Sequence, residues 1–259
     1  MKAVFFDIDG TLWGSDMKIP DSTKEALRRL KENGVYIFIC SGRTKVFIKD
    51  PALLALGFDG MVSGCGTCVE FQEQEILYKS IPCDVLEHTV SVLKRYHMPV
   101  ILEGRSCEYM DEADFMGDPF LDIIKRDVGE NMKSISGSSM EWEASKFSAA
   151  IKNDNYREAL TELNPWYDFL VHGTKVVEGV PKGFSKATGM QAMCRALNIS
   201  HEDTYAFGDS VNDLEMLKFA AWGIAMGNGT PEAKAAADYV TDSVNENGIY
   251  NACRHFSLI

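Results

Sequence analysis

Two aspartates near the start of the chain have the types and spacing needed for nucleophilic and acid–base chemistry. Asp7 and Asp9 lie two residues apart at the end of an apolar run that begins at Ala3, and Gly10 and Thr11 follow them. Carboxylates placed beyond a buried strand are costly unless they hold a cation or share a proton. One of them can attack while the other transfers protons. The alternative is a solvated acidic turn at a strand end.

A hydroxyl, a glycine and a guanidinium follow the second apolar run, 35–40. Ser41 can supply a hydroxyl, Gly42 a backbone N–H and Arg43 a guanidinium. Adjacent parallel strands end at the same edge of a sheet, so these groups can reach the crevice that holds Asp7. An ordinary turn is the alternative, because Ser-Gly-Arg is common in turns.

A second acidic segment, 208–213, ends one predicted strand and opens a helix with the sequence Gly-Asp-Ser-Val-Asn-Asp. Asp209, Asn212 and Asp213 offer the hard oxygen atoms that Mg²⁺ selects. Asp209 or Ser210 could instead cap the helix, but a cap does not explain the further polar oxygens.

Lys186 lies in the first turn of a predicted helix at 184–197, where the helix dipole disfavours a cation. A lysine there is either solvated or held by an anion, and we favour the anion. Lys182, at the preceding turn, is the weaker candidate for this role.

An alternation of strands and helices positions these residues and indicates a parallel α/β sheet. The predicted strands are 3–9, 35–40, 61–62, 203–207 and 222–226, and the predicted helices are 22–33, 44–56, 184–197, 212–220 and 231–237. In the first helix, Asp21 or Ser22 is the expected N-cap and Gly34 the expected end.

The middle of the chain has a different pattern, in which helices and strands mix after two short strands around a turn at 72–75. The predicted helices are 84–96 and 155–164, and the predicted strands are 99–103, 107–110, 147–152, 166–171 and 175–178. We therefore predict an inserted domain at 81–180 and a core formed by 1–80 and 181–259.

The ordered set of motifs resembles the haloacid dehalogenase superfamily. Asp-x-Asp-Gly-Thr at 7–11, Ser-Gly-Arg at 41–43, Lys186 and Gly-Asp-x-x-Asn-Asp at 208–213 follow its order, and an insertion after the second motif is similar to its Cof-type phosphatases of subclass IIB. The resemblance implies an α/β, Rossmann-like parallel-sheet core with an inserted α+β cap of the C2 type. One departure is Ser63-Gly64-Cys65, where Cof-type members usually carry Asn-Gly-Ala.

The resemblance also implies catalytic roles. Asp7 would attack phosphorus, while Asp9 would protonate the leaving oxygen and then deprotonate the water that hydrolyses the phosphoaspartate. Ser41 and Lys186 would hold phosphoryl oxygens. The full set of implied phosphate-binding residues is Ser41, Gly42, Arg43 and Lys186.

For the metal, the resemblance implies Mg²⁺ bound by the Asp7 carboxylate, the Asp9 backbone carbonyl and Asp209, with Asn212 and Asp213 in support. The implied function is a magnesium-dependent phosphatase for a small phosphate monoester, such as a sugar phosphate or a phosphorylated cofactor. A phosphotransferase or phosphomutase on the same intermediate is the nearest alternative. A non-catalytic module that binds magnesium or a phosphorylated metabolite is a third.

The composition limits the partners. A net charge of −12 repels phosphate backbones, so we expect no nucleic acid as a partner. The partner that the resemblance implies is a small phosphorylated metabolite. No apolar run approaches the length of a membrane span, and the amino terminus does not resemble a signal peptide. We expect a cytoplasmic protein without membrane contact.

The chain has seven cysteines, an odd and unpatterned set that indicates reduced thiols. Cys65 and Cys68 form a Cys-x-x-Cys pair, but the pair does not open a helix and no second pair completes a zinc site. We expect neither a redox nor a metal role for it.

Overall fold

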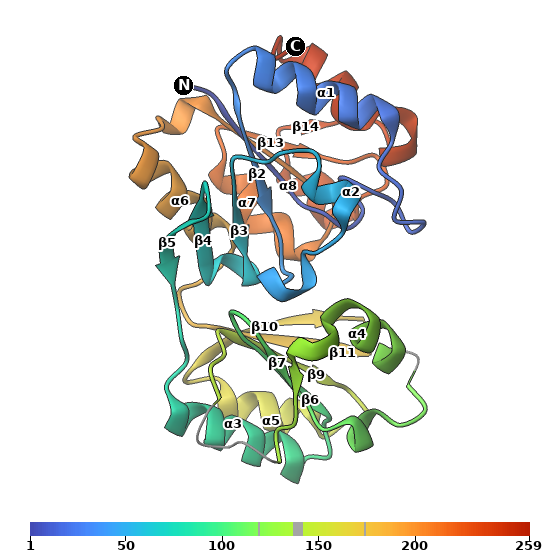
Figure 1. Cartoon of the computed structure of the whole chain (residues 1–259), viewed down its shortest axis with the longest axis vertical. Coiled ribbons are helices and arrows are strands. Elements are labelled where there is room, and N and C mark those ends of the chain that lie inside the picture. Colours follow the sequence, from blue (N-terminus) through green and yellow to red (C-terminus); the bar gives the residue numbers. More distant parts are fainter. Residues whose placement is uncertain (119, 137–141, 174) are drawn as a thin grey trace. The chain divides into compact units, whose positions relative to one another are not determined.

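The computed structural model describes residues 1–118, 120–136, 142–173 and 175–259, and the chain forms two compact units (Figure 1). The first unit comprises Met1–Gly42, Asp50–Leu77 and Ser185–Ile259, and the second comprises Arg43–Lys49 and Tyr78–Phe184. The second unit thus contains the predicted insertion and, in addition, a short segment that follows Gly42.

Among the described residues, the first unit is built on a sheet of eight strands in the order β14-β13-β12-β1-β2-β3-β4-β5. Neighbouring strands from β14 to β3 run parallel, and β4 is antiparallel to β3. The bounds are β1 Ala3–Phe6, β2 Tyr36–Cys40, β3 Gly60–Ser63, β4 Cys68–Phe71, β5 Gln74–Tyr78, β12 Thr204–Gly208, β13 Trp222–Ala225 and β14 Tyr239–Val240. The predicted parallel α/β core is confirmed.

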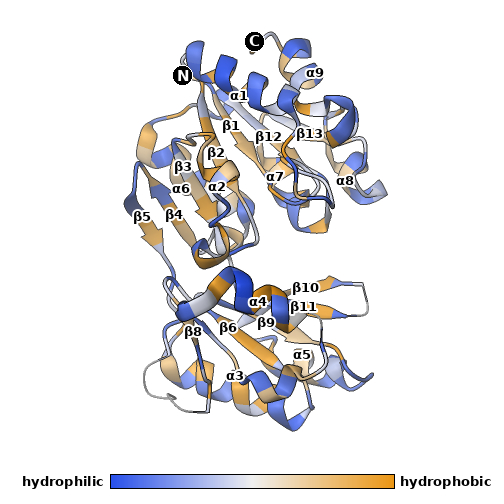
Figure 2. Ribbon diagram, turned by 45° about the vertical axis from the view of Figure 1, so that its right-hand side comes forward, coloured by the Kyte–Doolittle hydropathy of each residue, from blue (hydrophilic) through white to orange (hydrophobic). Residues whose placement is uncertain are grey.

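Helices pack against this sheet through apolar side chains. Phe5 and Phe38 share one core with Met190 and Met193 of α6, while α1 packs on β2 and on α9. Figure 2 shows α1 as largely hydrophilic, as expected for a helix with one buried face. The helix bounds are α1 Asp21–Glu32, α2 Pro51–Leu54, α6 Lys186–Leu197, α7 Leu214–Phe219, α8 Pro231–Ala236 and α9 Gly248–His255.

Two local predictions for the first part of the chain were wrong. The segment 44–56 is a 3-10 turn at Lys45–Phe47 followed by the short helix α2, because Pro51 lacks an N–H and can only open a helix. Asp50 caps α2 by accepting a hydrogen bond from the Leu53 N–H at 2.9 Å. The N-cap of α1 is Pro20, which makes no side-chain cap.

The second unit contains a six-stranded sheet, counted over its described residues, in the order β10-β11-β9-β6-β7-β8. Its strands are antiparallel neighbours except for β7 and β8, which are parallel. The bounds are β6 Val100–Glu103, β7 Glu108–Tyr109, β8 Met132–Lys133, β9 Lys146–Ala150, β10 Tyr167–His172 and β11 Val176–Pro181, with helices α3 Cys83–Arg95, α4 Phe120–Val128 and α5 Tyr156–Leu163. Of these, α4 and β8 were not predicted.

The two faces of this sheet differ in chemistry. Leu102 and Phe147 face a core that includes Leu93 of α3 and Leu163 of α5. Because side chains alternate along a strand, the residues adjacent to these two, Glu103 on β6 and Lys146 on β9, point to the other face. The described residues include no helix with the length and hydrophobicity needed to cross a bilayer.

Candidate active site

Three neighbouring strands bring the predicted site to one edge of the first sheet. β1 lies between β2 and β12, and Phe6 is in register with Ile39 on one side and Phe207 on the other. Asp7 follows β1 and donates its backbone N–H to the Phe207 carbonyl at 3.0 Å. Asp209 follows β12 directly, so both aspartates lie where parallel sheets place their ligands.

Lys186 is the central cation of the site. Ser185 caps α6 in a reciprocal capping box with Thr188, which fixes Lys186 as the first helical residue. The Lys186 side chain is fully buried, and its Nζ donates to Asp7 Oδ1 and to Asp213 Oδ1, each at 2.6 Å. The anion that we expected to hold this lysine is therefore a pair of the protein's own carboxylates.

Two glycines let α6 approach closely enough to deliver that lysine. A Cβ on Gly66 would lie 2.0 Å from the Ser185 carbonyl oxygen, and a Cβ on Gly189 would lie 2.3 Å from Cγ1 of Val62. Any larger residue at these positions would push the start of the helix away from the sheet.

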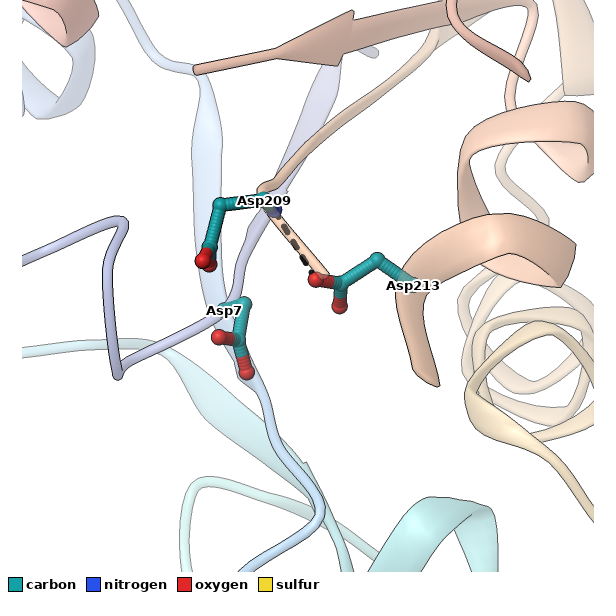
Figure 3. Close-up of side chains that lie close together, drawn as sticks. All are labelled: Asp7, Asp209 and Asp213. Carbon is teal, nitrogen blue, oxygen red and sulfur yellow. Dashed lines mark hydrogen bonds between the residues drawn. The ribbon is translucent and has the colours of Figure 1, made fainter. Parts of the chain in front are cut away.

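The Asp213 carboxylate is bonded on both oxygens. Oδ2 accepts from the backbone N–H groups of Asp209 and Ser210, each at 2.9 Å, and the first of these bonds is drawn in Figure 3. Oδ1 accepts from Lys186, and the side chain is fully buried. Asp213 therefore shapes the loop that carries Asp209. Asn212 lies nearby, with its Oδ1 3.4 Å from Lys186 Nζ.

Asp209 is positioned by the loop that follows β1. Its Oδ1 accepts a hydrogen bond from Thr11 Oγ1 at 3.1 Å. Gly10 has φ +84°, and a Cβ there would lie 2.3 Å from Asp209 Oδ2. Gly10 is thus required both by its backbone conformation and by the carboxylate packed against it.

Asp7, Asp209 and Asp213 each bring one carboxylate oxygen within 4.8 Å of the others (Figure 3). Burial raises the pKa of Asp7 well above its ordinary value, and repulsion from Asp213 and Asp209 adds to this in spite of the attraction of Lys186. Burial and Asp213 raise the pKa of Asp209 to about 6.

The charges around Lys186 therefore do not balance. Burial lowers the pKa of Lys186, but the attraction of Asp213 and Asp7 outweighs it and leaves this pKa well above its ordinary value. One ammonium thus faces three carboxylates. A divalent cation would relieve the excess negative charge, and oxygen ligands of this kind fit Mg²⁺.

Asp9 is placed apart from that group. Its side chain is exposed, and Oδ1 accepts a hydrogen bond from Trp13 Nε1 at 3.0 Å. The metal role predicted for Asp9 concerns its backbone carbonyl and so does not need the side chain to join the cluster.

Ser41 lies at the same edge, directly after β2. Its N–H donates to the Val62 carbonyl at 2.8 Å, and its carbonyl accepts from the Cys65 N–H at 3.1 Å. The preceding residue, Cys40, has its Sγ 3.9 Å from the Lys186 carbonyl oxygen. Gly42 ends this segment of the first unit, whereas Arg43 belongs to the second unit.

Sequence reasoning missed two residues that hold the loop after β1. Trp13 contacts Asp9, and Asn228 donates from Nδ2 to the Gly10 carbonyl at 2.7 Å. Asn228 also accepts the Val244 N–H at 2.8 Å. Asn228 lies in the loop after β13, another parallel strand of the same edge, so the strand-end argument applied to Asp7 could have found it.

Comparisons with known proteins agree with this geometry. The family model for haloacid dehalogenase-like hydrolases matches residues 4–253. The candidate phosphatase YkrA of Bacillus subtilis (strain 168) is 31% identical over 100% of this chain and 98% of its own length. The 5-amino-6-(5-phospho-D-ribitylamino)uracil phosphatase YcsE of the same organism is 26% identical over 100% of this chain and 96% of its own length.

Solved structures give the same result. The subclass IIB sugar phosphatase BT4131 matches with a TM-score of 0.87 and 31% identity, covering 100% of both chains. The resemblance inferred from the motifs is therefore confirmed. The chain belongs to the haloacid dehalogenase-like hydrolases and is a phosphoric monoester hydrolase.

Proposed function

We propose that this protein is a magnesium-dependent phosphatase that hydrolyses a small phosphate monoester, a sugar phosphate or a phosphorylated cofactor, through a phosphoaspartate on Asp7. The observation that carries the proposal is the buried Asp7 carboxylate, bonded at 2.6 Å to Lys186 beside two further aspartates. The sugar phosphatase and the ribitylaminouracil phosphatase among its relatives support small organic phosphates as substrates.

In the first half of the reaction, an oxygen of the Asp7 carboxylate forms a bond to phosphorus and the bond between phosphorus and the ester oxygen breaks. Asp9 gives its proton to that leaving oxygen. Lys186 reduces the repulsion between Asp7 and the phosphoryl group, and it supplies hydrogen bonds to the phosphoryl oxygens together with Ser41 and Gly42. Arg43 remains a prediction from its motif.

In the second half, Asp9 takes a proton from water as the water oxygen attacks phosphorus, which frees inorganic phosphate and restores Asp7. Asp7, Asp209 and the Asp9 carbonyl would hold Mg²⁺, which when bound supplies positive charge next to the carboxylates and the phosphoryl group. Asn212 and Asp213 would keep these groups in place.

The proposed roles of the two parts of the chain follow the predicted domain boundaries. We propose that 1–80 and 181–259 form the catalytic core and that 81–180 forms a cap that selects the leaving group. A cytoplasmic location stays a prediction from the sequence.

The test is release of inorganic phosphate from 4-nitrophenyl phosphate and from a panel of phosphorylated metabolites, with Mg²⁺ and with a chelator. We expect Mg²⁺-dependent release, and a loss on the order of a thousandfold or more in Asp7→Asn because the nucleophile is removed. Asp16→Asn is the matched control, since Asp16 is exposed in the same unit. Unchanged turnover in Asp7→Asn would contradict the mechanism, and an isomeric sugar phosphate as product would indicate a mutase.

A further inference from the structure

Trp13 binds the Asp9 turn through its main chain and its side chain. Nε1 of Trp13 donates to Asp9 Oδ1 at 3.0 Å, and its carbonyl accepts the Gly10 N–H at 2.9 Å. The Trp13 N–H in turn lies 3.3 Å from the Ile8 carbonyl oxygen, so the loop closes on itself around Asp9.

The two partners differ in burial. Asp9 is exposed, whereas only 1% of the Trp13 surface is accessible. An exposed aspartate samples several rotamers, while a side chain packed in the core has a single position. The indole N–H is a donor only, and its direction is fixed by the ring. The rigid residue therefore determines the orientation of the mobile one.

The main chain beside Asp9 has a separate anchor. Asn228 connects the Gly10 carbonyl to the Val244 N–H, with bonds of 2.7 and 2.8 Å. These bonds fix the backbone of the turn but do not touch the Asp9 carboxyl group. The Trp13 indole N–H, in contrast, bonds directly to that carboxyl group.

We propose that Trp13 is a positioning residue, which aims the Asp9 carboxyl group at the leaving oxygen and later at the attacking water. This inference rests on the proposed function. Proton transfer requires the acid within hydrogen-bond reach of the oxygen that it serves, so a carboxyl group free to rotate is a poorer acid and base. The effect should grow as the leaving group becomes poorer, because a poor leaving group depends more on its proton.

The test compares two substrates of similar shape, 4-nitrophenyl phosphate and phenyl phosphate, in Trp13→Phe. The value of kcat/KM reports the steps up to phosphoaspartate formation. We expect kcat/KM for phenyl phosphate, the poorer leaving group, to fall about 10- to 100-fold, and that for 4-nitrophenyl phosphate to fall less than about threefold. A merely structural role would lower both values by the same factor.

Three controls sharpen the result. Trp222→Phe makes the same change at a side chain that is 43% exposed on β13, and its ratio of the two kcat/KM values should equal that of the wild type. In an Asp9→Asn background, Trp13→Phe should change that ratio no further. Benzothienylalanine at position 13 keeps the ring volume but lacks the N–H, so it should reproduce the loss even if Trp13→Phe folds poorly.

Equal losses on both substrates, or an unchanged ratio with benzothienylalanine, would overturn the role of Trp13. Absence of phosphate release by the wild-type protein would instead overturn the proposed function.

Discussion

Each of the two units encloses a lysine between two carboxylates. The two clusters differ in the partners that neighbouring residues supply to those carboxylates. In the first unit, Lys186 is bonded to Asp7 and Asp213. In the second, Lys146 pairs with Glu178 and lies 3.3 Å from Glu103. Both lysines are almost completely buried.

In the second unit, residues of neighbouring strands supply further partners for both carboxylates. Ser148 donates to Glu103, and His172 Nε2 lies 2.8 Å from Glu178 Oε1. Although burial raises it, the pKa of Glu178 is held well below its ordinary value by Lys146 and His172. The interior of an antiparallel sheet thus supplies partners from both sides.

The remaining carboxyl group beside this cluster is neutralised differently. Glu108 accepts from Thr44 Oγ1 at 2.7 Å, and burial together with repulsion from Glu103 raises its pKa well above the ordinary value. The raised pKa favours a bound proton on Glu108, which would remove the excess charge there. At the strand ends of the first unit, the excess falls on Asp7 and Asp209, where we propose that a metal cation balances it.

The largest expected effect concerns Lys146→Met. Removing one partner of a buried ion pair leaves unpaired charge, so the free energy of unfolding should fall by about 3–5 kcal/mol. Urea denaturation measures this fall, and addition of Mg²⁺ should not restore the lost stability. Lys182→Met is the control, because Lys182 pairs with Asp168 at 3.0 Å on the surface and should cost about 1 kcal/mol or less. Equal losses would show that the Lys146 cluster contributes no more than a surface pair.

The next effect is the response to Mg²⁺. A cation that binds only the folded state, at about 100 times its Kd, should raise the free energy of unfolding by about 2.7 kcal/mol. Asp209→Asn should remove most of this gain, whereas Asp16→Asn should retain it. Thermal unfolding with Mg²⁺ or a chelator measures the shift, and a full gain in Asp209→Asn would contradict the assignment of the site.

A smaller effect separates two glycines of the first unit. Gly10→Ala would place a Cβ against Asp209, so the Mg²⁺ concentration for half-maximal activity should rise about tenfold or more. Gly34→Ala is matched to it, because Gly34 has φ +71° but open space around its Cβ position. Gly34→Ala should cost stability through its backbone alone and leave the Mg²⁺ requirement unchanged. The same Mg²⁺ shift in both variants would implicate backbone strain instead.

The last expected effect is a pH dependence in the second unit. The folded state keeps the proton of Glu108 above pH 4.5, its ordinary pKa, while the unfolded chain loses it. Stability must then decline as pH rises, by up to about 1.4 kcal/mol per pH unit until the folded pKa is reached. Glu108→Gln has no such proton to lose, so the free energy of unfolding of this variant minus that of the wild type should increase as the pH rises above about 5, until the folded pKa of Glu108 is reached. Urea denaturation of both proteins at a series of pH values measures this difference. The contributions of the other titrating groups are the same in both proteins and cancel. A constant difference would mean that Glu108 is charged in the folded protein.

Sequence reasoning assigned the cluster around Asp7 to one place because parallel strands end at the same edge of a sheet. Residues after three such strands, together with Lys186, could be assigned to one place without knowing any side-chain direction. The contact of Trp13 with Asp9 could not be predicted in this way, because a tryptophan four residues after the aspartate is expected to be an ordinary core residue. The pairing of Glu103 with Lys146 depends on the register of β6 and β9, which no local pattern indicates.

The segment Arg43–Lys49 bears on how this protein could be shortened. Val46 from that segment packs in one apolar cluster with Ile101 and Ile124 of the second unit. A protein shortened by deleting 78–184 would therefore expose the apolar side chains of 43–49. The excised fragment would expose the apolar side chains that pack against that segment. The second unit is formed by two separate segments of the chain. Expressing the first unit alone would therefore require substitution of apolar residues in 43–49 as well as removal of 78–184.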